Sequence, residues 1–409
     1  MRIRKTGKTA WIWILSAVLA ITCTACTQEQ KKTESRVLRV WYCEDEMTDY
    51  LTLAAAEYEK QTGVRVECSK IDSKQYLEQI AGASLKEGEN VPDLYLLRND
   101  ELGRACMEGI AAPNRIEDYN SERYCDTALR AASYQDTLMA YPLYYNTACM
   151  LTNTDYFPEA PATMGAITSF SETAQIDENI QYILYWDVND YLCNYPFIGK
   201  YIDIGGTNGD DAQSLSIVNE QTVQCLQSFQ QLGQYFAIDS ETIQTEDVPA
   251  ALMEGRTLCI LADSSMVHEI NWYAVNNGVE IPYHISPVPD ITDELESCAG
   301  SYTELVVVNG LGMQQEASAE LAEYLSDEFL GHLYDLSGHF AAKRDVSFEN
   351  AELEELYRVY EQSEPFPKLL EAEDNRVWLE VLFANVWGGA DIGQEFQNYS
   401  DKMTARMNK

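Results

Sequence analysis

Three short polar segments follow apolar, strand-like runs in this chain. Cys43-Glu44-Asp45 follows VLRVWY, Arg98-Asn99-Asp100 follows DLYLL, and Asp263-Ser264-Ser265 follows ILA. Their carboxylate, amide and hydroxyl groups could hydrogen-bond a polar small molecule. Ligands of open α/β sheets bind outside the carboxyl ends of the strands, so these segments are the first candidates for a binding site.

Motifs typical of common enzymes are absent from the sequence. We find no Gly-x-Ser-x-Gly elbow, no HExxH and no phosphate-binding loop. The 66 acidic residues offer many carboxylate pairs of the kind that glycosidases use, but such abundance makes any one pair uninformative. The four histidines lack metal-ligand spacing, and we expect neither a metal nor a cofactor.

Strand-like and helix-like segments alternate from Val37 onward. Runs of β-favouring residues at VLRVWYC, VRVEC and DLYLL enclose two amphipathic helical patterns, the first closed by Gly63 and the second with Ser73 as a plausible cap. This alternation predicts βαβ units, with mainly parallel sheets flanked by helices. Further on, TLMAYPLYYNTACMLTN reads as two strands interrupted near Pro142, and the last 60 or so residues read as wholly helical.

The N-terminus has the layout of a signal peptide. Four basic residues precede a twelve-residue apolar run, residues 10–21. That run is shorter than the roughly 20 residues of a membrane-spanning helix, so a permanent transmembrane anchor is the weaker interpretation. Thr24-Ala25-Cys26 resembles the lipobox of bacterial lipoproteins, with Cys23 where Leu is usual. We therefore predict a signal peptide over 1–25, lipidation at Cys26 and a lipidated tether over 26–36.

The chain is strongly acidic, with 28 Lys and Arg against 66 Asp and Glu. Loss of residues 1–25 would remove four basic residues and leave 24 against 66, a net charge near −42. Nucleic acid and anionic lipid bind through Lys and Arg, so neither is expected as a partner.

Beyond the N-terminal region, nine cysteines are widely spaced and form no CxxC pair. Cys225 and Cys259 lie inside apolar runs, where cysteine behaves as a small hydrophobic residue. We favour buried free thiols over a disulfide framework.

Four segments, in order, resemble the extracellular solute-binding proteins of ABC importers, the family that includes the maltose-binding protein. They are VLRVWYCEDEMTDYLTLAAAEYEKQTGVRVE, VPDLYLLRNDELGRACMEGIAAP, TLMAYPLYYNTACMLTNTDYF and AALMEGRTLCILADSS. The resemblance implies a two-lobe α/β fold of the periplasmic-binding-protein type (type II), joined by hinge strands. The expected lobes are 37–142 plus 283–328 and 143–282 plus 329–409.

The resemblance also implies a function. It indicates a monomeric lipoprotein, held at the extracellular face of a Gram-positive cell membrane, that closes its lobes around a saccharide and delivers it to an ABC permease. A sensory protein that presents its ligand to a receptor remains an alternative, and an extracellular glycosidase is a further one.

Sugar sites pair in-plane polar groups with aromatic rings that stack on the sugar faces. From the family's positions the resemblance implies ligand contacts by Asp100, Tyr195 and Trp378, with Glu44 and Asp45 in the first loop. Asp100 could instead cap a helix, and Trp378 could instead be helix core. The full set of predicted ligand residues is Glu44, Asp45, Asn99, Asp100, Tyr144, Asn146, Tyr195, Ser264 and Trp378.

Three positions depart from the maltodextrin-binding pattern. Leu97 and Ser265 stand where a stacking Trp is common, and Asn146 stands where a carboxylate often follows the hinge strand. A saccharide other than a long maltodextrin is therefore expected, with Tyr42, Tyr144 or Trp186 as compensating aromatics.

Overall fold

A computed structural model describes residues 37–72, 74–86, 90–236, 238–344, 346–348, 350–369 and 372–407. The predicted signal peptide, Cys26, the tether and Ser73 lie outside the described residues. Residues 38–409 form one compact unit.

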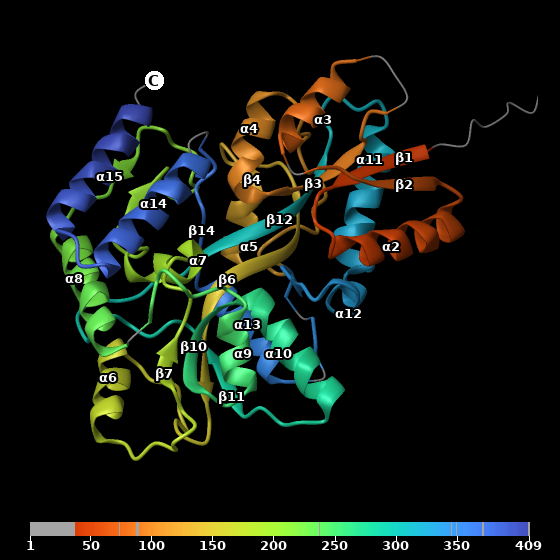
Figure 1. Ribbon diagram of the computed structural model, residues 1–409. Coiled ribbons are helices and arrows are strands. Elements are labelled where there is room, and N and C mark those ends of the chain that lie inside the picture. Colours follow the sequence, from red (N-terminus) through yellow and green to blue (C-terminus); the bar gives the residue numbers. More distant parts are fainter. Residues whose placement is uncertain are drawn as a thin grey trace, which may run out of the picture. The chain divides into compact units, whose positions relative to one another are not determined.

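The helices are distributed along the whole of the described chain (Figure 1). They are α2 (Met47–Thr62), α3 (Tyr76–Ser84), α4 (Leu102–Met107), α5 (Asp126–Ala131), α6 (Met164–Thr173), α7 (Tyr191–Asn194), α8 (Glu220–Tyr235), α9 (Asp247–Met253), α10 (Ser264–Asn277), α11 (Gln315–Glu323), α12 (Leu333–Ser337), α13 (Glu352–Glu361), α14 (Ala372–Trp387) and α15 (Ile392–Met407).

The strands are shorter, apart from two long ones at the centre. They are β1 (Val37–Tyr42), β2 (Arg65–Lys70), β3 (Leu94–Arg98), β4 (Ser133–Tyr134), β5 (Thr137–Leu138), β6 (Tyr141–Asn153), β7 (Tyr182–Tyr185), β8 (Asp203–Ile204), β9 (Leu215–Ser216), β10 (Thr257–Asp263), β11 (Tyr283–Ser286), β12 (Gly300–Val308), β13 (Phe340–Ala341) and β14 (Glu364–Pro365).

The central sheet is mixed rather than mainly parallel. Its main path runs β2-β1-β3-β12-β6-β10-β7. β1 pairs in parallel with β3, and β10 with β7, whereas β12 and β6 pair antiparallel with their neighbours. The two parallel parts are thus joined by two long antiparallel strands, which cross the middle of Figure 1.

β6 belongs to both halves of this sheet. Its first part, Tyr141–Thr147, pairs with β12, and its second part, Ala148–Thr152, pairs with β10. The segment predicted to hold two strands interrupted near Pro142 holds β5 and β6, with the break at residues 139–140. Pro142 lies near the start of β6, where its missing N–H is tolerated, and the register of β12 shifts between Glu304 and Leu305 opposite this region.

The first predicted helix is confirmed as α2. Tyr50, Leu51, Ala54 and Tyr58 are its buried face, as the spacing of the apolar residues requires. Gly63 ends it in the left-handed conformation, with φ at +74°, and donates its N–H to the Glu59 carbonyl. Glycine adopts this conformation without strain.

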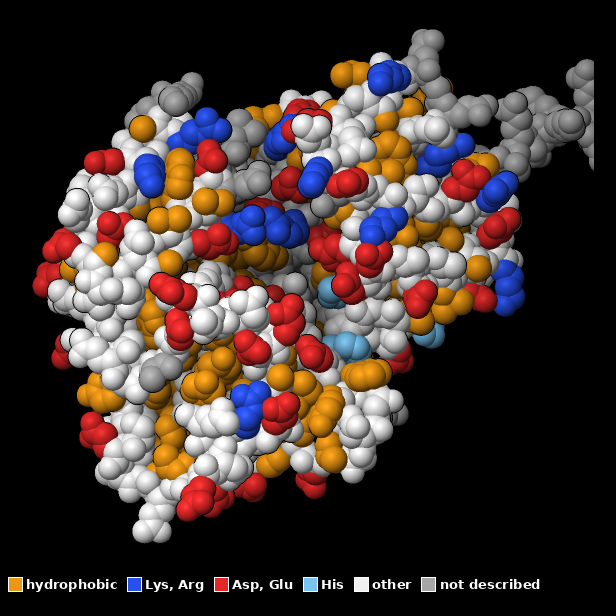
Figure 2. All heavy atoms as spheres, in the orientation of Figure 1, with side chains coloured by type: hydrophobic (Ala, Val, Ile, Leu, Met, Phe, Trp, Pro, Cys, Tyr) orange, Lys and Arg blue, Asp and Glu red, His pale blue; other side chains and the backbone are white. Residues whose placement is uncertain are grey.

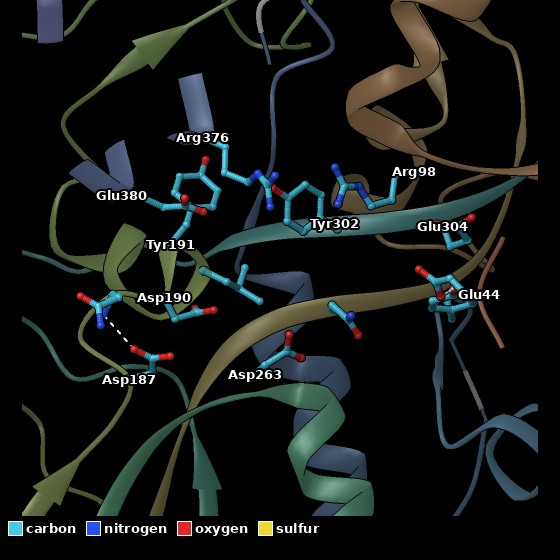
Figure 3. A pocket seen from close by; sticks show the side chains of 14 residues that line it. Glu44, Arg98, Asp187, Asp190, Tyr191, Asp263, Tyr302, Glu304, Arg376 and Glu380 are labelled. Carbon is cyan, nitrogen blue, oxygen red and sulfur yellow. Dashed lines mark hydrogen bonds between the residues drawn. The ribbon is translucent and has the colours of Figure 1, made fainter. Parts of the chain in front are cut away.

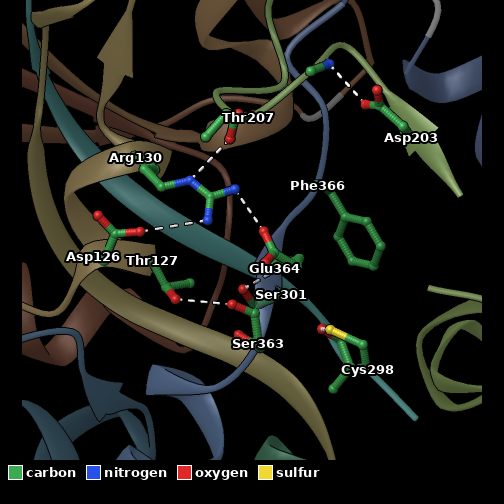
Figure 4. A network of polar contacts seen from close by, with 12 residues as sticks. Asp126, Thr127, Arg130, Asp203, Thr207, Cys298, Ser301, Ser363, Glu364 and Phe366 are labelled. Atoms are coloured by element: carbon green, nitrogen blue, oxygen red, sulfur yellow. Dashed lines mark hydrogen bonds and ion pairs between the residues drawn. The ribbon is translucent and has the colours of Figure 1, made fainter. Parts of the chain in front are cut away.

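The C-terminal region is not wholly helical. β14 interrupts it and pairs with β12 at Gly300 and Ser301. Pro365 and Pro367 lack the N–H that a helix interior requires. Side chains fix this segment, because Arg130 donates to Glu364 at 2.5 Å and Thr127 donates to the Ser363 carbonyl at 2.9 Å (Figure 4).

Helices α8, α14 and α15 pack against one another, and α14 also contacts α7. Phe229 of α8 contacts Phe383 and Trp387 of α14 at centroid distances of 5.3 and 5.2 Å. This aromatic cluster holds α14 against α8, and α14 and α7 both contribute residues to the cavity described below.

Each of the nine cysteines that the structure describes is free, and Cys125, Cys149, Cys193, Cys225 and Cys259 are buried. The prediction that Cys225 and Cys259 are buried is confirmed. Within the described residues, no helix has both the length and the apolar character needed to cross a membrane.

Candidate functional site

A cavity of about 420 Å³ opens where the long strands meet the loops that follow β1, β3, β7 and β10. A hollow is visible in the face shown in Figure 2, with acidic and basic side chains around it. Its lining is mostly polar: Glu44, Arg98, Tyr144, Asn146, Asp187, Asn189, Asp190, Tyr191, Leu192, Asp263, Tyr302, Glu304, Arg376 and Glu380 (Figure 3).

The two long strands supply the middle of the cavity wall. Tyr144 and Asn146 are two residues apart on β6, so they point to the same face, as do Tyr302 and Glu304 on β12. The register pairs Asn146 with Tyr302 and Tyr144 with Glu304. Strand pairing therefore places these four side chains together.

The remaining walls come from strand ends and helices. Glu44 follows β1, Arg98 ends β3 and Asp263 ends β10. Arg376 and Glu380 are one helical turn apart on α14 and so share a face. The strands predicted at β1, β3 and β10 are confirmed, and polar side chains at their carboxyl ends line the cavity.

Glu44 is held by a buried tyrosine. The Tyr144 hydroxyl donates a short hydrogen bond to Glu44 Oε2, and the Tyr144 ring stacks on His339 with centroids 3.9 Å apart and planes 7° apart. Burial raises the pKa of Glu44, and the bond from Tyr144 opposes that rise. Burial lowers the pKa of His339 to about 4, so its Nε2, 3.8 Å from Glu44 Oε2, carries no charge at neutral pH.

Glu304 is the most deeply buried acid of the lining, with 5% of its surface exposed. Burial raises its pKa well above the usual range, the charge of Glu44 raises it further, and Arg98 opposes the rise. Glu44 and Glu304 lie side by side at one end of the cavity (Figure 3).

Arg98 is oriented by Asp100. Its Nε and Nη2 donate to the two Asp100 carboxylate oxygens at 3.1 and 2.7 Å. Its guanidinium carbon also lies 4.3 Å from the centroid of the Tyr302 ring. Asp100, predicted to contact the ligand, is thus engaged by Arg98, whose guanidinium lines the cavity.

Carboxylates line the opposite end as well. Asp263 caps α10, accepting from the Ser265 N–H at 2.8 Å, and burial raises the pKa of Asp263 to about 6. Asp190 caps α7 by accepting from the Cys193 N–H at 2.7 Å, and burial raises the pKa of Asp190 too. Asp187 accepts from the Thr245 hydroxyl at 2.8 Å.

A second, wider groove of about 1220 Å³ adjoins the cavity, and the two share Glu44, Arg98, Glu304 and Arg376. Asp45 and Asp100 line this groove. Asp45 is exposed and pairs with Lys70. The cavity and the groove together leave room for a ligand longer than a single ring.

Of the predicted ligand residues, Glu44, Tyr144 and Asn146 meet in the cavity. Two others lie outside its lining and make internal bonds: Asn99 bridges the Phe366 carbonyl and the Thr303 N–H at 2.9 and 2.8 Å, and Ser264 accepts from the Thr147 N–H at 3.2 Å.

The predicted aromatic contacts lie outside the cavity lining. Tyr195 is buried against Phe366, with centroids 4.9 Å apart, and Trp378 packs, half-buried, against the hydrophobic core. Trp186 is fully buried and donates its Nε1–H to Asn194 at 3.0 Å. Tyr42 is buried as well. Tyr144 is thus the one proposed compensating aromatic that reaches the lining.

Sequence reasoning missed most of the charged lining. Asp187, Asp190, Arg376 and Glu380 come from elements whose docking no local pattern reveals. Glu304 had a usable signal, because it is the single charged residue in the apolar run TELVVVN, and a buried acid in a strand is rare unless it has a role.

One further acidic cluster lies elsewhere. Ligand atoms of Asp118, Glu323 and Asp327 lie within 4.8 Å of one another. Arg123 pairs with Asp327 at 2.5 Å, and Lys343 pairs with it as well. These two cations offset part of the charge of the three carboxylates.

A polar cavity at strand ends, walled by two long antiparallel strands, defines a small-molecule binding protein of the α/β class. The family model for bacterial extracellular solute-binding proteins matches residues 54–328. The chain belongs to this family.

Solved structures support the same two-lobe fold. The extracellular solute-binding protein from Staphylococcus aureus, solved with maltose, has a TM-score of 0.78 at 18% identity, covering 92% of this chain and 99% of its own. A sugar-binding protein from Xanthomonas citri has 0.77 at 17% identity, covering 91% and 97%. A cyclo/maltodextrin-binding protein complexed with maltotetraose has 0.76 at 16% identity, covering 92% and 98%. No curated protein sequence matches this chain.

Proposed function

We propose that this protein is the lipid-anchored receptor of an ABC importer, and that it captures a saccharide in the cavity and delivers it to a membrane permease. The observation that carries this proposal is the cavity itself, in which groups from β1, β3, β6, β7, β10, β12 and α14 converge on one polar space. Carboxylates, amides and arginines of this kind hydrogen-bond hydroxyl groups in plane.

The structural relatives support a saccharide as the solute. Similar chains have been solved with maltose, maltotetraose and maltopentaose. The groove beside the cavity would accommodate further units of an oligosaccharide. Leu97 lines the groove, whereas Ser265 lines neither the cavity nor the groove. Both stand where a stacking Trp is common in the maltodextrin-binding pattern, and these departures favour a saccharide other than a long maltodextrin.

Calorimetric titration of the purified mature chain with mono- and oligosaccharides tests the proposal. We expect one class of saccharide to bind with a 1:1 stoichiometry and to be recovered intact from the mixture. Failure of every saccharide to bind a folded protein would refute saccharide capture, and recovery of shortened products would favour a glycosidase instead.

We further propose that capture proceeds by closure of two lobes, 37–142 plus 283–328 and 143–282 plus 329–409, about the shared strands. Ligand contacts made only in the closed form would drive this closure. Small-angle scattering should then show a smaller radius of gyration with the saccharide bound. An unchanged radius at saturating ligand would contradict closure.

The anchor and the permease need separate tests. Mass spectrometry of the mature N-terminus should find a diacylglycerol-modified Cys26, and an unmodified N-terminus would contradict the anchor. Deletion of the gene should abolish uptake of the bound saccharide, whereas unchanged uptake together with a lost transcriptional response would favour a sensory role.

A further inference from the structure

The cavity wall carries more acidic side chains than cationic ones. Six of its acids have no Lys or Arg within 4.0 Å among the described residues: Glu44, Asp187, Asp190, Asp263, Glu304 and Glu380. The two cations of the lining are Arg98, which Asp100 already neutralises, and Arg376.

Among these acids, Glu304 shows the lack of a partner most clearly. Its side chain is more than nine-tenths buried and lines the cavity, yet no described residue donates a hydrogen bond to its carboxylate. Buried carboxylates are ordinarily paired or hydrogen-bonded. The adjacent Glu44 adds charge of the same sign, and His339 does not offset it, because burial lowers the pKa of that imidazole to about 4.

The aromatic rings of the lining offer little stacking surface. Tyr144 is 3% exposed and stacked on His339, and Tyr191 is 5% exposed. Tyr302 has the Arg98 guanidinium over its ring. Neutral glucans depend on such faces for much of their binding, so this wall favours recognition by charge over recognition by stacking.

We propose that the solute carries a protonated amine, which lies between Glu44 and Glu304, and that the solute is an oligosaccharide of amino sugars. The inference rests on the proposed capture of a saccharide and names its chemical class. Charge-assisted hydrogen bonds from the ammonium to the two carboxylates would supply the donors that the empty wall lacks.

Binding should be coupled to proton release. Burial raises the pKa of Glu304 well above its usual range, which favours the protonated carboxyl group in the empty cavity. An ammonium in contact with this carboxyl group favours the ionised form, and the displaced proton passes to the buffer. The heat of binding would then depend on the ionisation enthalpy of the buffer.

Four ligands test the proposal at a mildly acidic pH, where glucosamine amines are protonated: the trimer of glucosamine, its N-acetylated form, cellotriose and spermidine. The glucosamine trimer and cellotriose share their linkage and differ in the amine. We expect the glucosamine trimer to bind about tenfold or more tightly than cellotriose, the magnitude typical of a charge-assisted bond, with proton release for the amine alone.

Two variants locate the effect. Glu304→Gln should reduce the preference for the glucosamine trimer over cellotriose about tenfold. Glu172→Gln removes the same charge from an exposed position on α6 outside the cavity lining and should leave the preference unchanged.

The possible failures are distinguishable. If the wild type binds cellotriose or the acetylated trimer as tightly as the glucosamine trimer or more tightly, the solute does not need a protonated amine. That result would refute the present inference and remain compatible with saccharide capture. If spermidine binds most tightly, recognition of an amine is supported and a saccharide as the solute is refuted. Binding of none of the four, nor of other saccharides, would contradict both proposals.

Discussion

Replacement of Asp263 by Asn should make the empty protein more stable at neutral pH. Asp263 ends β10, lines the cavity and caps α10 through its bond from the Ser265 N–H. Asn caps helices about as well as Asp, so the substitution keeps the cap and removes a charge that the protein holds in a poorly solvated position.

The magnitude follows from the pKa. Burial raises the pKa of Asp263 from about 3.8 to about 6, which is about two pH units. At about 1.4 kcal/mol per unit this corresponds to about 3 kcal/mol. Part of the carboxylate reaches solvent in the cavity, so we expect a gain of about 1 to 3 kcal/mol in the free energy of unfolding.

The sign of the pH dependence is fixed by the direction of this pKa change. Between the unfolded and folded pKa values, about 3.8 and 6, the folded state binds more protons than the unfolded state. The contribution of Asp263 to the free energy of unfolding of the wild type therefore falls as pH rises through that window. The advantage of Asp263→Asn should be complete above the folded pKa and vanish near the unfolded one.

Urea unfolding at neutral pH and near pH 4 measures both effects. Asp155→Asn, an exposed position, is the control for the loss of one negative charge and should change stability by less than about 0.5 kcal/mol. A variant that is less stable than wild type at neutral pH, or equally stabilised at both pH values, would refute the reasoning.

Three further predictions concern packing and buried polar groups. In Gly103→Ala the new methyl carbon would lie 2.1 Å from the Lys368 carbonyl oxygen, so urea unfolding should show a free energy of unfolding lower by about 1 to 3 kcal/mol. The control is Gly82→Ala, whose new methyl carbon would have nothing within 4 Å and which should be neutral or stabilising. Tyr144→Phe removes the donor to Glu44, and saccharide affinity measured by calorimetry should fall severalfold; unchanged affinity would show that this bond does not position Glu44. Burial lowers the pKa of Lys368 from about 10.5 to about 8, so between these values the unfolded state binds more protons. Raising the pH through this window should stabilise wild type relative to Lys368→Met by about 3 kcal/mol, and a pH-independent difference between the two would contradict the assignment.

Local pattern was sufficient for much of the fold. The spacing of Leu51, Ala54 and Tyr58, with Gly63 after them, predicts α2 and its end because helix periodicity and a left-handed cap are local properties. The strands β1, β3 and β10 were found in the same way. Their carboxyl ends do supply part of the cavity, as the general rule for α/β sheets requires.

Side-chain choice within those loops was not predictable. In the segment from Arg98 to Asp100, the acid was expected to reach the ligand, but a bidentate ion pair turns it toward Arg98, and the arginine lines the cavity. A sequence does not reveal side-chain rotamers, so either Arg98 or Asp100 could have been the residue that lines the cavity. The Asn99 side chain likewise forms hydrogen bonds with Thr303 and Phe366, which are more than 200 residues away in the sequence.

Contributions from docked helices were also beyond local reasoning. On α14, Trp378 drew attention because aromatic rings stack on sugars, yet Arg376 and Glu380 share the face that meets the cavity. Which face of a helix points inward depends on its neighbours, here α7, α8 and α15. The break between β5 and β6 was predicted within a few residues, but the pairing of β6 with both halves of the sheet was not, because it depends on the distant strands β12 and β10.

The place of β12 in the sheet bears on how the chain is made. It lies between β3 and β6, yet its residues, Gly300–Val308, come after about three quarters of the sequence. The first half of the sheet therefore lacks its central strand until late in synthesis, and its early strands have open edges. If the predicted signal peptide directs the chain across the membrane before it folds, this late strand delays folding on the cytoplasmic side. It also leaves those edges exposed to aggregation, so a chaperone that keeps the nascent chain apart is an expected requirement of its biogenesis.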